Sequence, residues 1–427
     1  MSIAIVGMLD EREEALRIIK DQIERRGIKT CLIDISIGNG ASVPSLQADV
    51  SAREVAESVE GTGITAGPPA ADEKHTAISR MGEGLKRKIL SFRESEGLQG
   101  IIAVAGMTGT LISLQAMKAL PFGFPKLLLS SAAAMPAHAS QLAEYFALKD
   151  ITVMHTVVDT VGVNRLVRAL AMNGANAISG MVESGEPLLQ ADRPSLAITE
   201  FGFCDRGAHY IREILGEDYE IVSFHAIGLG DMVAIDFVRQ GYFQAFLDLV
   251  PGTFSEHLFG GNRASGPDRL DIAMDRPIPY VFCPGGFDMI SCGPLERRDR
   301  GDVLWSSRRL AERKLNVQDA LRVHARTSVE EMEQLGTVVA EKLNRYEHKG
   351  RVKVVIPRKG FSTLSVEGGP LYDPVADGAF IAALRRGLDP QIGVTEVDTD
   401  INSRDFAWVV KAALSDASRA AGDEWHG

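Results

Sequence analysis

The residues with the best spacing for chemistry lie in the stretch Val222–Val238. Its first five residues are predicted to form a strand, Gly228 and Gly230 a tight turn, and Asp231 the cap of the helix that follows. A junction of this kind points backbone N–H groups and the positive end of a helix dipole at whatever lies beyond the strand. The stretch therefore predicts an anion site. Glycines at strand-to-helix turns also serve packing, and both interpretations stay open.

Similar small and polar residues follow other predicted strands. In open parallel sheets, ligands bind beyond the carboxyl ends of the strands, where small residues let the backbone approach and hydroxyl and N–H groups bind phosphate. A carboxylate in such a loop can hold Mg²⁺ or a ribose. We therefore expect a nucleotide or another phosphorylated ligand, with Mg²⁺ beside it. The candidate contacts are Gly7, Asp10, Gly106, Thr108, Gly109, Thr110, Ser130, Ser131, Gly228, Gly230 and Asp288.

Structural roles compete with several of these assignments. Asp10 is placed to cap the helix that follows it, which is the commoner role of an aspartate there. Ser130 and Ser131 favour ligand binding or a strand-end cap over a hydrolase nucleophile, because the sequence has no GxSxG elbow. The segment Gly106–Thr110 lacks the lysine of a Walker P-loop, and the later glycine turn lacks the third glycine of GxGxxG. The sequence also has no HExxH or CxxC zinc motif.

Two further residues support a rival, enzymatic hypothesis. His225 ends a predicted strand just before the glycine turn, which suits a general acid or base, although a histidine that donates to a backbone carbonyl is about as common. Arg269 lies near a predicted helix start after Pro267 and suits an anion clamp, with a simple ion pair as the alternative. In this hypothesis the two side chains act on a small phosphorylated or carboxylated substrate in a cleft between domains.

Alternating strands and helices must position these residues. Continuous apolar strands such as Ile3–Val6 and Gly100–Ala105, separated by helical patterns, indicate parallel sheets that are buried on both faces. The same pattern recurs in the second half of the chain. We predict a three-layer α/β protein with two Rossmann-like domains of mainly parallel sheets, residues 1–190 and 195–427. The polar stretch Glu183–Pro194 is the predicted linker.

The composition limits the classes of protein to which this chain can belong. A chain of 427 residues with 45% hydrophobic and 24% charged residues is globular and long enough for two domains. The net charge of −11 argues against broad binding of nucleic acid or acidic membranes. The four cysteines form no CxxC pair, and no apolar stretch reaches the length of a membrane span, so we expect a cytoplasmic protein with reduced thiols. The segment Ser36–Pro69, rich in Gly, Ser and Pro, is expected to be a functional loop.

Five motifs, taken in order, carry a family resemblance. They are FHAIGLG (224–230), SGPDRLDIA (265–273), PGGFDMI (284–290), LGTVVAEKLN (335–344) and IPRKGFSTLSVEGGPLYDPVAD (356–377). Over essentially its whole length the chain resembles the uncharacterised bacterial family that also forms the N-terminal ATP-binding, inhibitory region of the tomato mosaic virus resistance protein. The resemblance implies a two-domain Rossmann-like architecture, nucleotide binding, self-association and no settled catalytic activity.

The sequence departs from this family at several site positions. Where the family tends to carry Gly-Thr-x-Asp-Thr-Lys-Gly, this chain keeps only Gly7 and Asp10. The family's Gly-Gly-Ser-Gly-Gly-Thr is 105–110 here, Asp231 replaces a glycine, and Asp400 replaces a histidine. The expected ligand is therefore ATP, a related nucleotide, or a different phosphorylated or acidic metabolite.

The leading hypothesis is a nucleotide-binding, self-associating protein of undetermined activity that takes an ATP-like ligand with Mg²⁺. The rival hypothesis is the metabolic enzyme described above. A third class is an interaction protein, as the plant relative implies, although no residue of this chain specifically transfers that activity. We expect neither nucleic acid nor a membrane as a partner.

Overall fold

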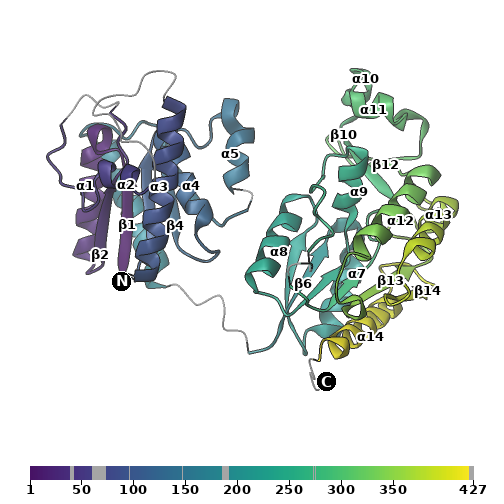
Figure 1. Ribbon diagram of the computed structural model, residues 1–427. Coiled ribbons are helices and arrows are strands. Elements are labelled where there is room, and N and C mark those ends of the chain that lie inside the picture. The colour runs from purple at the N-terminus through teal and green to yellow at the C-terminus, as the bar shows by residue number, and fades with distance from the viewer. Residues whose placement is uncertain are drawn as a thin grey trace. The chain divides into compact units, whose positions relative to one another are not determined.

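The protein is described by a computed structural model that covers residues 1–38, 43–59, 74–95, 97–146, 148–184, 192–272, 274 and 276–422. The chain divides into two compact units, Met1–Leu188 and Leu189–Gly427, and each is considered by itself (Figure 1). Much of the predicted functional loop Ser36–Pro69 and most of the predicted linker Glu183–Pro194 lie outside the described residues.

The N-terminal unit is built on a five-stranded parallel sheet. Its strand order is β2 (Lys29–Asp34), β1 (Ser2–Gly7), β3 (Gly100–Ala105), β4 (Lys126–Ser130) and β5 (Thr152–His155). The central strand β3 is buried along its whole length, whereas the edge strand β5 is largely exposed. Because every strand runs the same way, the loops that follow the strands converge on one edge of the sheet.

Helices cover both faces of this sheet. One face carries α1 (Leu9–Arg25) and α6 (Arg165–Glu183), and the other carries α2 (Ala52–Glu57), α3 (Lys74–Ser95), α4 (Met107–Ala119) and α5 (Ala139–Phe146). Strand β1 shows why three layers form: Ile3 and Ile5 enter one core, and Ala4 and Val6 enter the other. Side chains alternate along a strand, so a continuous apolar strand serves two cores at once.

The C-terminal unit is built on a six-stranded parallel sheet. Its strand order is β14 (Gly393–Val397), β13 (Val352–Pro357), β9 (Tyr280–Phe282), β8 (Ala245–Asp248), β6 (Ser195–Glu200) and β7 (Glu220–His225). Helices α7 (Asp205–Leu215) and α14 (Arg404–Ala421) share one apolar core with this sheet. No residue of α8 (Leu229–Gln240), α12 (Val329–Leu343) or α13 (Pro374–Gly387) belongs to the described core on that side, and the usual right-handed crossover between parallel strands would place these helices on the opposite face.

A second, small sheet extends from this unit. It is antiparallel, with strand order β10 (Met289–Gly293), β12 (Val323–Arg326) and β11 (Leu315–Val317). Short helices surround it, namely α9 (Gly252–Phe259), α10 (Leu295–Asp299) and α11 (Val303–Ser307). The described residues also include 3₁₀ turns at Pro136–His138, Gly202–Cys204, Leu310–Glu312 and Lys349–Arg351.

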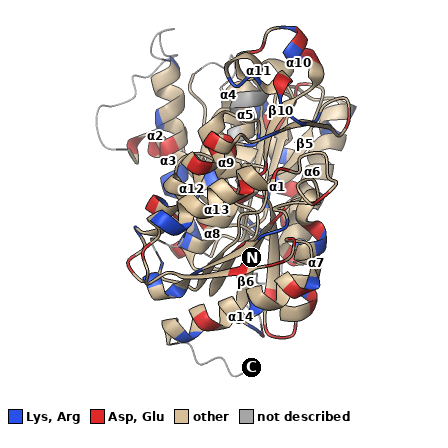
Figure 2. Cartoon of the chain, turned by 90° about the vertical axis from the view of Figure 1, so that its right-hand side faces the viewer, with Lys and Arg blue, Asp and Glu red and all other residues tan. Residues whose placement is uncertain are grey.

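Charges of both signs are interspersed over the exposed helices (Figure 2). On α7 and α14 they form ion pairs between the helices and their surroundings, such as Arg404 with Glu213 at 3.1 Å and Lys411 with Asp218 at 2.7 Å. Exposed pairs of this kind contribute little stability each, and the shared apolar core fixes the two helices. Among the described helices, none is long and apolar enough to cross a membrane.

The predicted fold class, α/β with mainly parallel sheets in three layers, is confirmed. The sequence analysis missed β8, α9 and the whole small sheet. It also described Gly106–Thr110 as a loop, whereas α4 already begins at Met107. Likewise α8 begins at Leu229, so Asp231 lies in its first turn and is not the residue before it.

Close packing of α12 on α13 gives a test of the fold. A Cβ at Gly336 would lie 2.5 Å from the Phe380 carbonyl oxygen and 2.9 Å from the Ala383 Cβ, so Gly336→Ala is expected to cost about 1–3 kcal/mol of unfolding free energy. Gly378→Ala on α13 is the control, because its Cβ would meet no described atom within 4 Å. It should stabilise the unit by up to about 1 kcal/mol through helix propensity. Urea unfolding measures the unfolding free energy of both variants. Equal changes in the two would contradict the close packing at Gly336.

Candidate functional site

A pocket of about 470 Å³ lies at the carboxyl edge of the N-terminal sheet. Its walls come from the segments that follow β1, β3, β4 and β5 and from the start of α3. The lining residues are Met8, Glu11, Arg12, Lys74, Gly106, Met107, Thr108, Gly109, Ser131, Ala132, Met135 and Asp159. Four of the predicted contacts, Gly106, Thr108, Gly109 and Ser131, are therefore brought together here.

Arg12 is the dominant charge in this pocket. Its side chain is only 4% exposed and leaves α1 where the backbone departs from helical geometry (φ −128°, ψ 21°). One guanidinium nitrogen, Nη1, donates to Asp159 Oδ1 at 2.6 Å and to Thr160 Oγ1 at 3.0 Å. The other, Nη2, lies so close to the backbone that a Cβ at Gly106 would be only 2.6 Å from it. The residue before α4 is thus a glycine because the guanidinium occupies the space of a side chain.

The N-terminus of α4 forms the wall beside Arg12. The first hydrogen bond within the helix runs from Thr110 N–H to the Gly106 carbonyl at 2.9 Å. The amides of residues 107–109 precede that bond, so the helix itself provides no acceptor for them, and their residues line the pocket. A buried guanidinium and the positive end of a helix dipole therefore meet in one place. This arrangement suits an anion such as a phosphate group.

Four other predicted contacts lie next to the pocket and do not line it. Thr110 and Ser130 are fully buried, and their hydroxyl oxygens are 2.7 Å apart. Ser130 Oγ also accepts from the backbone N–H groups of Ala132 and Ala133, at 3.0 Å each. These two hydroxyls hold the loop after β4 in place, so their contribution to a ligand is indirect.

Gly7 and Asp10 have comparable supporting positions. A Cβ at Gly7 would lie 2.8 Å from a Leu16 methyl carbon, so that glycine allows α1 to pack on β1. The backbone N–H of Asp10 donates to Ser36 Oγ at 3.3 Å, which ties α1 to the end of β2. Sequence reasoning missed Arg12, Lys74 and the remaining lining residues. The available signal was that Arg12 stands where the related family tends to carry a lysine, so the positive charge is retained.

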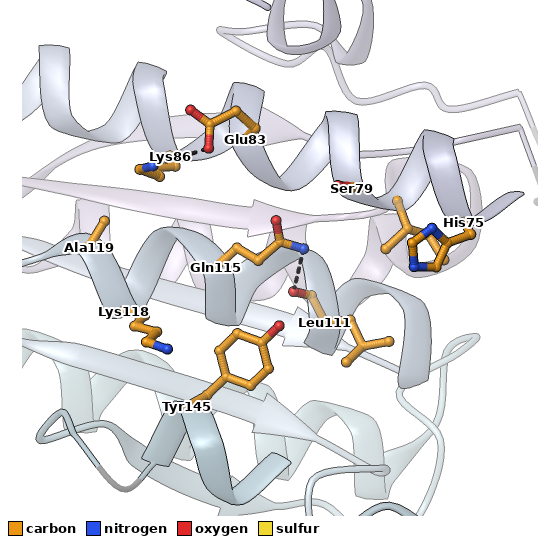
Figure 3. A pocket seen from close by; sticks show the side chains of 10 residues that line it. His75, Ser79, Glu83, Lys86, Leu111, Gln115, Lys118, Ala119 and Tyr145 are labelled. Carbon is orange, nitrogen blue, oxygen red and sulfur yellow. Dashed lines mark hydrogen bonds and ion pairs between the residues drawn. The ribbon is translucent and has the colours of Figure 1, made fainter. Parts of the chain in front are cut away.

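A second described pocket, of about 720 Å³, lies among α3, α4 and α5 (Figure 3). Two of its cations already have partners: Lys86 pairs with Glu83 at 3.1 Å, and Lys118 lies 5.6 Å from the centre of the Tyr145 ring. The Gln115 amide donates to the Leu111 carbonyl at 3.3 Å. The pocket is lined by outer helix residues and by no residue that directly follows a strand, and we do not favour it as the functional site.

In the C-terminal unit, the glycine turn at 228–230 serves packing. Gly228 has a φ of +95°, a conformation that favours glycine. A Cβ at Gly230 would lie 2.2 Å from the His225 carbonyl oxygen, so any side chain there would clash with the end of β7. Asp231, expected at the mouth of a phosphate site, is fully buried, and its Oδ2 accepts from the Gly228 N–H at 2.9 Å. The packing interpretation of this turn is therefore the one that the contacts support.

Arg269 is enclosed by carboxylates, which corrects its assignment as an anion clamp. The side chain is fully buried, and its Nη1 and Nη2 donate to the two oxygens of Asp248 at 2.8 and 2.7 Å. Its Nε donates to Asp231 Oδ1 at 2.5 Å. Burial alone would lower the pKa of Arg269, but the charges of Asp248 and Asp231 outweigh burial and raise it. The guanidinium thus links the end of β8 to the first turn of α8 inside the unit, and His225 lies exposed at the end of β7 without this cation as a partner.

Asp288 belongs to another buried group in the same unit. It is 0% exposed, and its Oδ2 accepts from Ser362 Oγ at 2.6 Å. Burial raises its pKa, while the nearby Arg326 lowers it. Arg326 in turn donates to Asp377 Oδ1 at 2.5 Å. Burial raises the pKa of Asp377 to about 6, although Arg326 lowers it and Asp288 adds to the increase.

The Arg269 network predicts a large structural effect of substitution. Arg269→Met leaves Asp231 and Asp248 buried without their cation, so it should cost about 3–5 kcal/mol of unfolding free energy in the C-terminal unit. Arg298→Met is the control, because that arginine is exposed and pairs with its neighbour Asp299 on the surface. Chemical unfolding of both variants measures the difference. Unchanged stability of Arg269→Met would contradict the structural role.

Asp377 predicts a defined dependence of stability on pH. Its pKa is about 6 in the folded chain against 3.8 for a free side chain, so the folded state keeps a proton that the unfolded chain releases between these values. The stabilising contribution is complete below pH 3.8 and is lost as pH rises through 6, by on the order of 3 kcal/mol. The difference in unfolding free energy between wild type and Asp377→Asn should follow this course. A difference that is flat across this range would refute it.

Comparison with known proteins places the chain in a family. The N-terminal domain model of the uncharacterised protein family UPF0261 matches residues 1–187, and the C-terminal domain model of that family matches residues 193–418. A UPF0261 protein of Clostridium tetani is 33% identical over 407 residues, which cover 95% of this chain and 96% of that protein. The ToMV resistance protein Tm-1(GCR237) of Solanum lycopersicum is 29% identical over 345 residues, or 79% of this chain and 44% of the plant protein.

Solved structures add only a distant likeness. The UDP-GlcNAc 2-epimerase from Neisseria meningitidis, bound to UDP-GlcNAc, matches 66% of this chain and 82% of its own length. Its sequence identity is 10% and the TM-score is 0.26, values that carry no argument about activity. The family models and the bacterial relative span both units, and on that basis the chain is a member of the uncharacterised protein family UPF0261.

Proposed function

We propose that the protein binds a phosphorylated small molecule, with an ATP-like nucleotide as the first candidate, in the pocket of the N-terminal unit. The observation that carries this proposal is the buried Arg12 guanidinium, held against Gly106 at the N-terminus of α4. Two independent sources of positive potential, a side chain and a helix end, meet at one wall of one pocket. The family resemblance, which implies nucleotide binding, supports the same conclusion.

The remaining lining residues suit the rest of such a ligand. The pocket volume of about 470 Å³ lies within the ~300–1,000 Å³ typical of small-molecule sites. Met8, Met107 and Met135 give it a polarizable, adaptable wall, which suits an apolar or aromatic part of the ligand. Lys74, from the start of α3, adds a second cation for the phosphates.

The carboxylates of the pocket fit a magnesium ion only together with the ligand. Among the residues that the structure describes, no three His, Cys, Asp or Glu side chains gather into a metal site of their own. Glu11 and Asp159 nevertheless line the pocket, and Mg²⁺ is commonly held by one or two carboxylates plus substrate phosphates. These two residues would hold the ion, which would neutralise phosphate charge. The chain's own cations, Arg12 and Lys74, would orient the phosphates.

Substitution of Arg12 tests the proposal. Arg12→Gln should weaken binding of MgATP or inorganic pyrophosphate by roughly ten- to hundredfold, because a hydrogen bond to a charged group contributes about 1.5–3 kcal/mol. Arg53→Gln is the control, since Arg53 is 83% exposed on α2 and pairs with Glu57. Isothermal titration calorimetry measures both variants. The proposal fails if wild type binds neither ligand, or if Arg12→Gln binds as wild type does.

A methyl group beside the guanidinium gives a second test that keeps the charge. Gly106→Ala would place a Cβ 2.6 Å from Arg12 Nη2 and so push the guanidinium away from the start of α4. Affinity for the phosphorylated ligand should fall by about tenfold or more. Gly180→Ala on α6 is the control, because its Cβ would meet no described atom within 4 Å. Equal affinities of the two variants would show that Arg12 and α4 do not act together.

A further inference from the structure

The small antiparallel sheet of the C-terminal unit presents a polar face. Ser291 on β10 pairs with His324 on β12, and Met289 pairs with Arg326. The backbone N–H and carbonyl of Ser291 bond to Glu256 and to Asn262, not to His324, so Ser291 and His324 form a non-hydrogen-bonded pair with close side chains. Side chains two residues apart share a face, which places Arg326 next to His324.

Polar atoms at this face lack partners although they are buried. Within the described part of the chain, no hydrogen-bond partner exists for Ser291 Oγ, His324 Nδ1, Arg326 Nε and Nη1, or Asp288 Oδ1. The four side chains are 7%, 5%, 3% and 0% exposed in that order. Native proteins leave few buried polar groups unpaired, and each one costs free energy. Three of these residues lie on neighbouring positions of one small sheet and Asp288 directly precedes it, and together they indicate a ligand that supplies the missing partners.

The face lies where an α/β sheet holds its ligands. Strand β10 begins just beyond the carboxyl end of β9, and Ser362, which bonds to Asp288, follows β13. The His324 ring meets the Phe203 ring edge to face at 5.1 Å, and Phe203 follows β6. Figure 1 shows β10 and β12 at the end of this unit opposite the C-terminus. The small sheet thus covers the carboxyl edge of the large one, which is the usual binding edge.

We propose that Ser291, His324 and Arg326, with Asp288 beside them, form a binding site for a small 2-hydroxycarboxylic acid. Arg326 anchors the carboxylate through the N–H groups that its bonds to Asp377 Oδ1 and the Asp373 carbonyl leave unused. Ser291 Oγ and His324 Nδ1 are the partners of the ligand hydroxyl. Their cross-strand pair is adjacent, on the same face, to the pair that contains Arg326. This site is distinct from the phosphate pocket of the N-terminal unit.

The charges around the face favour a monoanion over a phosphate dianion. Arg326 is the guanidinium on this face of the small sheet, and the carboxylates of Asp377 and Asp288 already lie near it. Burial, together with the neighbouring Arg263 and Arg322, lowers the pKa of His324 to about 4, so its ring is neutral at pH 7. A second negative charge on the ligand would add to the repulsion from these two buried carboxylates. These atoms are closed to solvent, so entry of the acid requires the small sheet to move from the loops it covers.

The binding test uses the full chain and a panel of glycolate, lactate and glycerate, with acetate and inorganic phosphate for comparison. At least one hydroxy acid should bind in calorimetry, about tenfold or more tightly than acetate, and Arg326→Gln should weaken it by roughly ten- to hundredfold. Arg385→Gln is the control, because Arg385 is 64% exposed on α13 and pairs with Glu396. Absence of binding by all three hydroxy acids, or equal affinities of the two variants, overturns the proposal.

Two serine substitutions test the proposal even if Arg326→Gln fails to fold. Ser291→Ala removes a hydroxyl without a described partner, so its melting temperature should equal or exceed that of wild type, while its affinity for the hydroxy acid falls by about tenfold. Ser255→Ala is the matched control, because the buried Ser255 hydroxyl donates to the Gly252 carbonyl at 2.7 Å. It should lower the melting temperature and leave affinity unchanged. The proposal is overturned if Ser291→Ala binds the hydroxy acid as tightly as wild type does, whatever its melting temperature.

Discussion

Burial of the Arg12 guanidinium is the constraint on which the N-terminal site depends. A cation that is only 4% exposed needs polar partners, and Asp159 and Thr160 supply two of them. Its Nη2 leaves no room for a side chain at residue 106, so the residue before α4 is a glycine and the helix begins directly beside the charge. The same packing that buries Arg12 therefore directs a guanidinium and a helix N-terminus at one pocket. The proposed anion site is thus a consequence of how the Arg12 guanidinium is packed.

Three buried arginines show how different partners give different roles. Arg269 is enclosed by Asp231 and Asp248, which use its donors inside the C-terminal core. Arg12 pairs with Asp159 at 2.6 Å and with Glu11 at 3.6 Å, and it borders a pocket. Arg326 bonds to Asp377 but keeps two nitrogens without a described partner. The sequence alone does not distinguish the roles of these three arginines. The number and positions of their partners show which arginine is structural and which can bind a ligand.

The sheets could be predicted from the sequence because each buried strand is a continuous apolar run, as in β1 and β3. The four-residue β8 was missed because its apolar residues continue into the following turn, which hides its end. Among site residues, glycines and hydroxyls near strand ends were recognisable by type. Arg12 was not, because an arginine in an amphipathic helix usually faces solvent, and its partner Asp159 lies 147 residues away. The role of Arg269 likewise depends on residues outside its own segment, Asp231 and Asp248, which lie 38 and 21 residues away in the sequence.

The most direct test of the central claim is the position of a bound anion. Tungstate is a heavy analogue of phosphate, and its anomalous scattering locates it in a crystal without assumptions about the ligand. The account predicts a tungstate peak within hydrogen-bonding distance of Arg12 Nη2 and the backbone amides of residues 107–109, and loss of that peak in Arg12→Gln. Ordered tungstate only at other positions, or an unchanged peak in the variant, would contradict it.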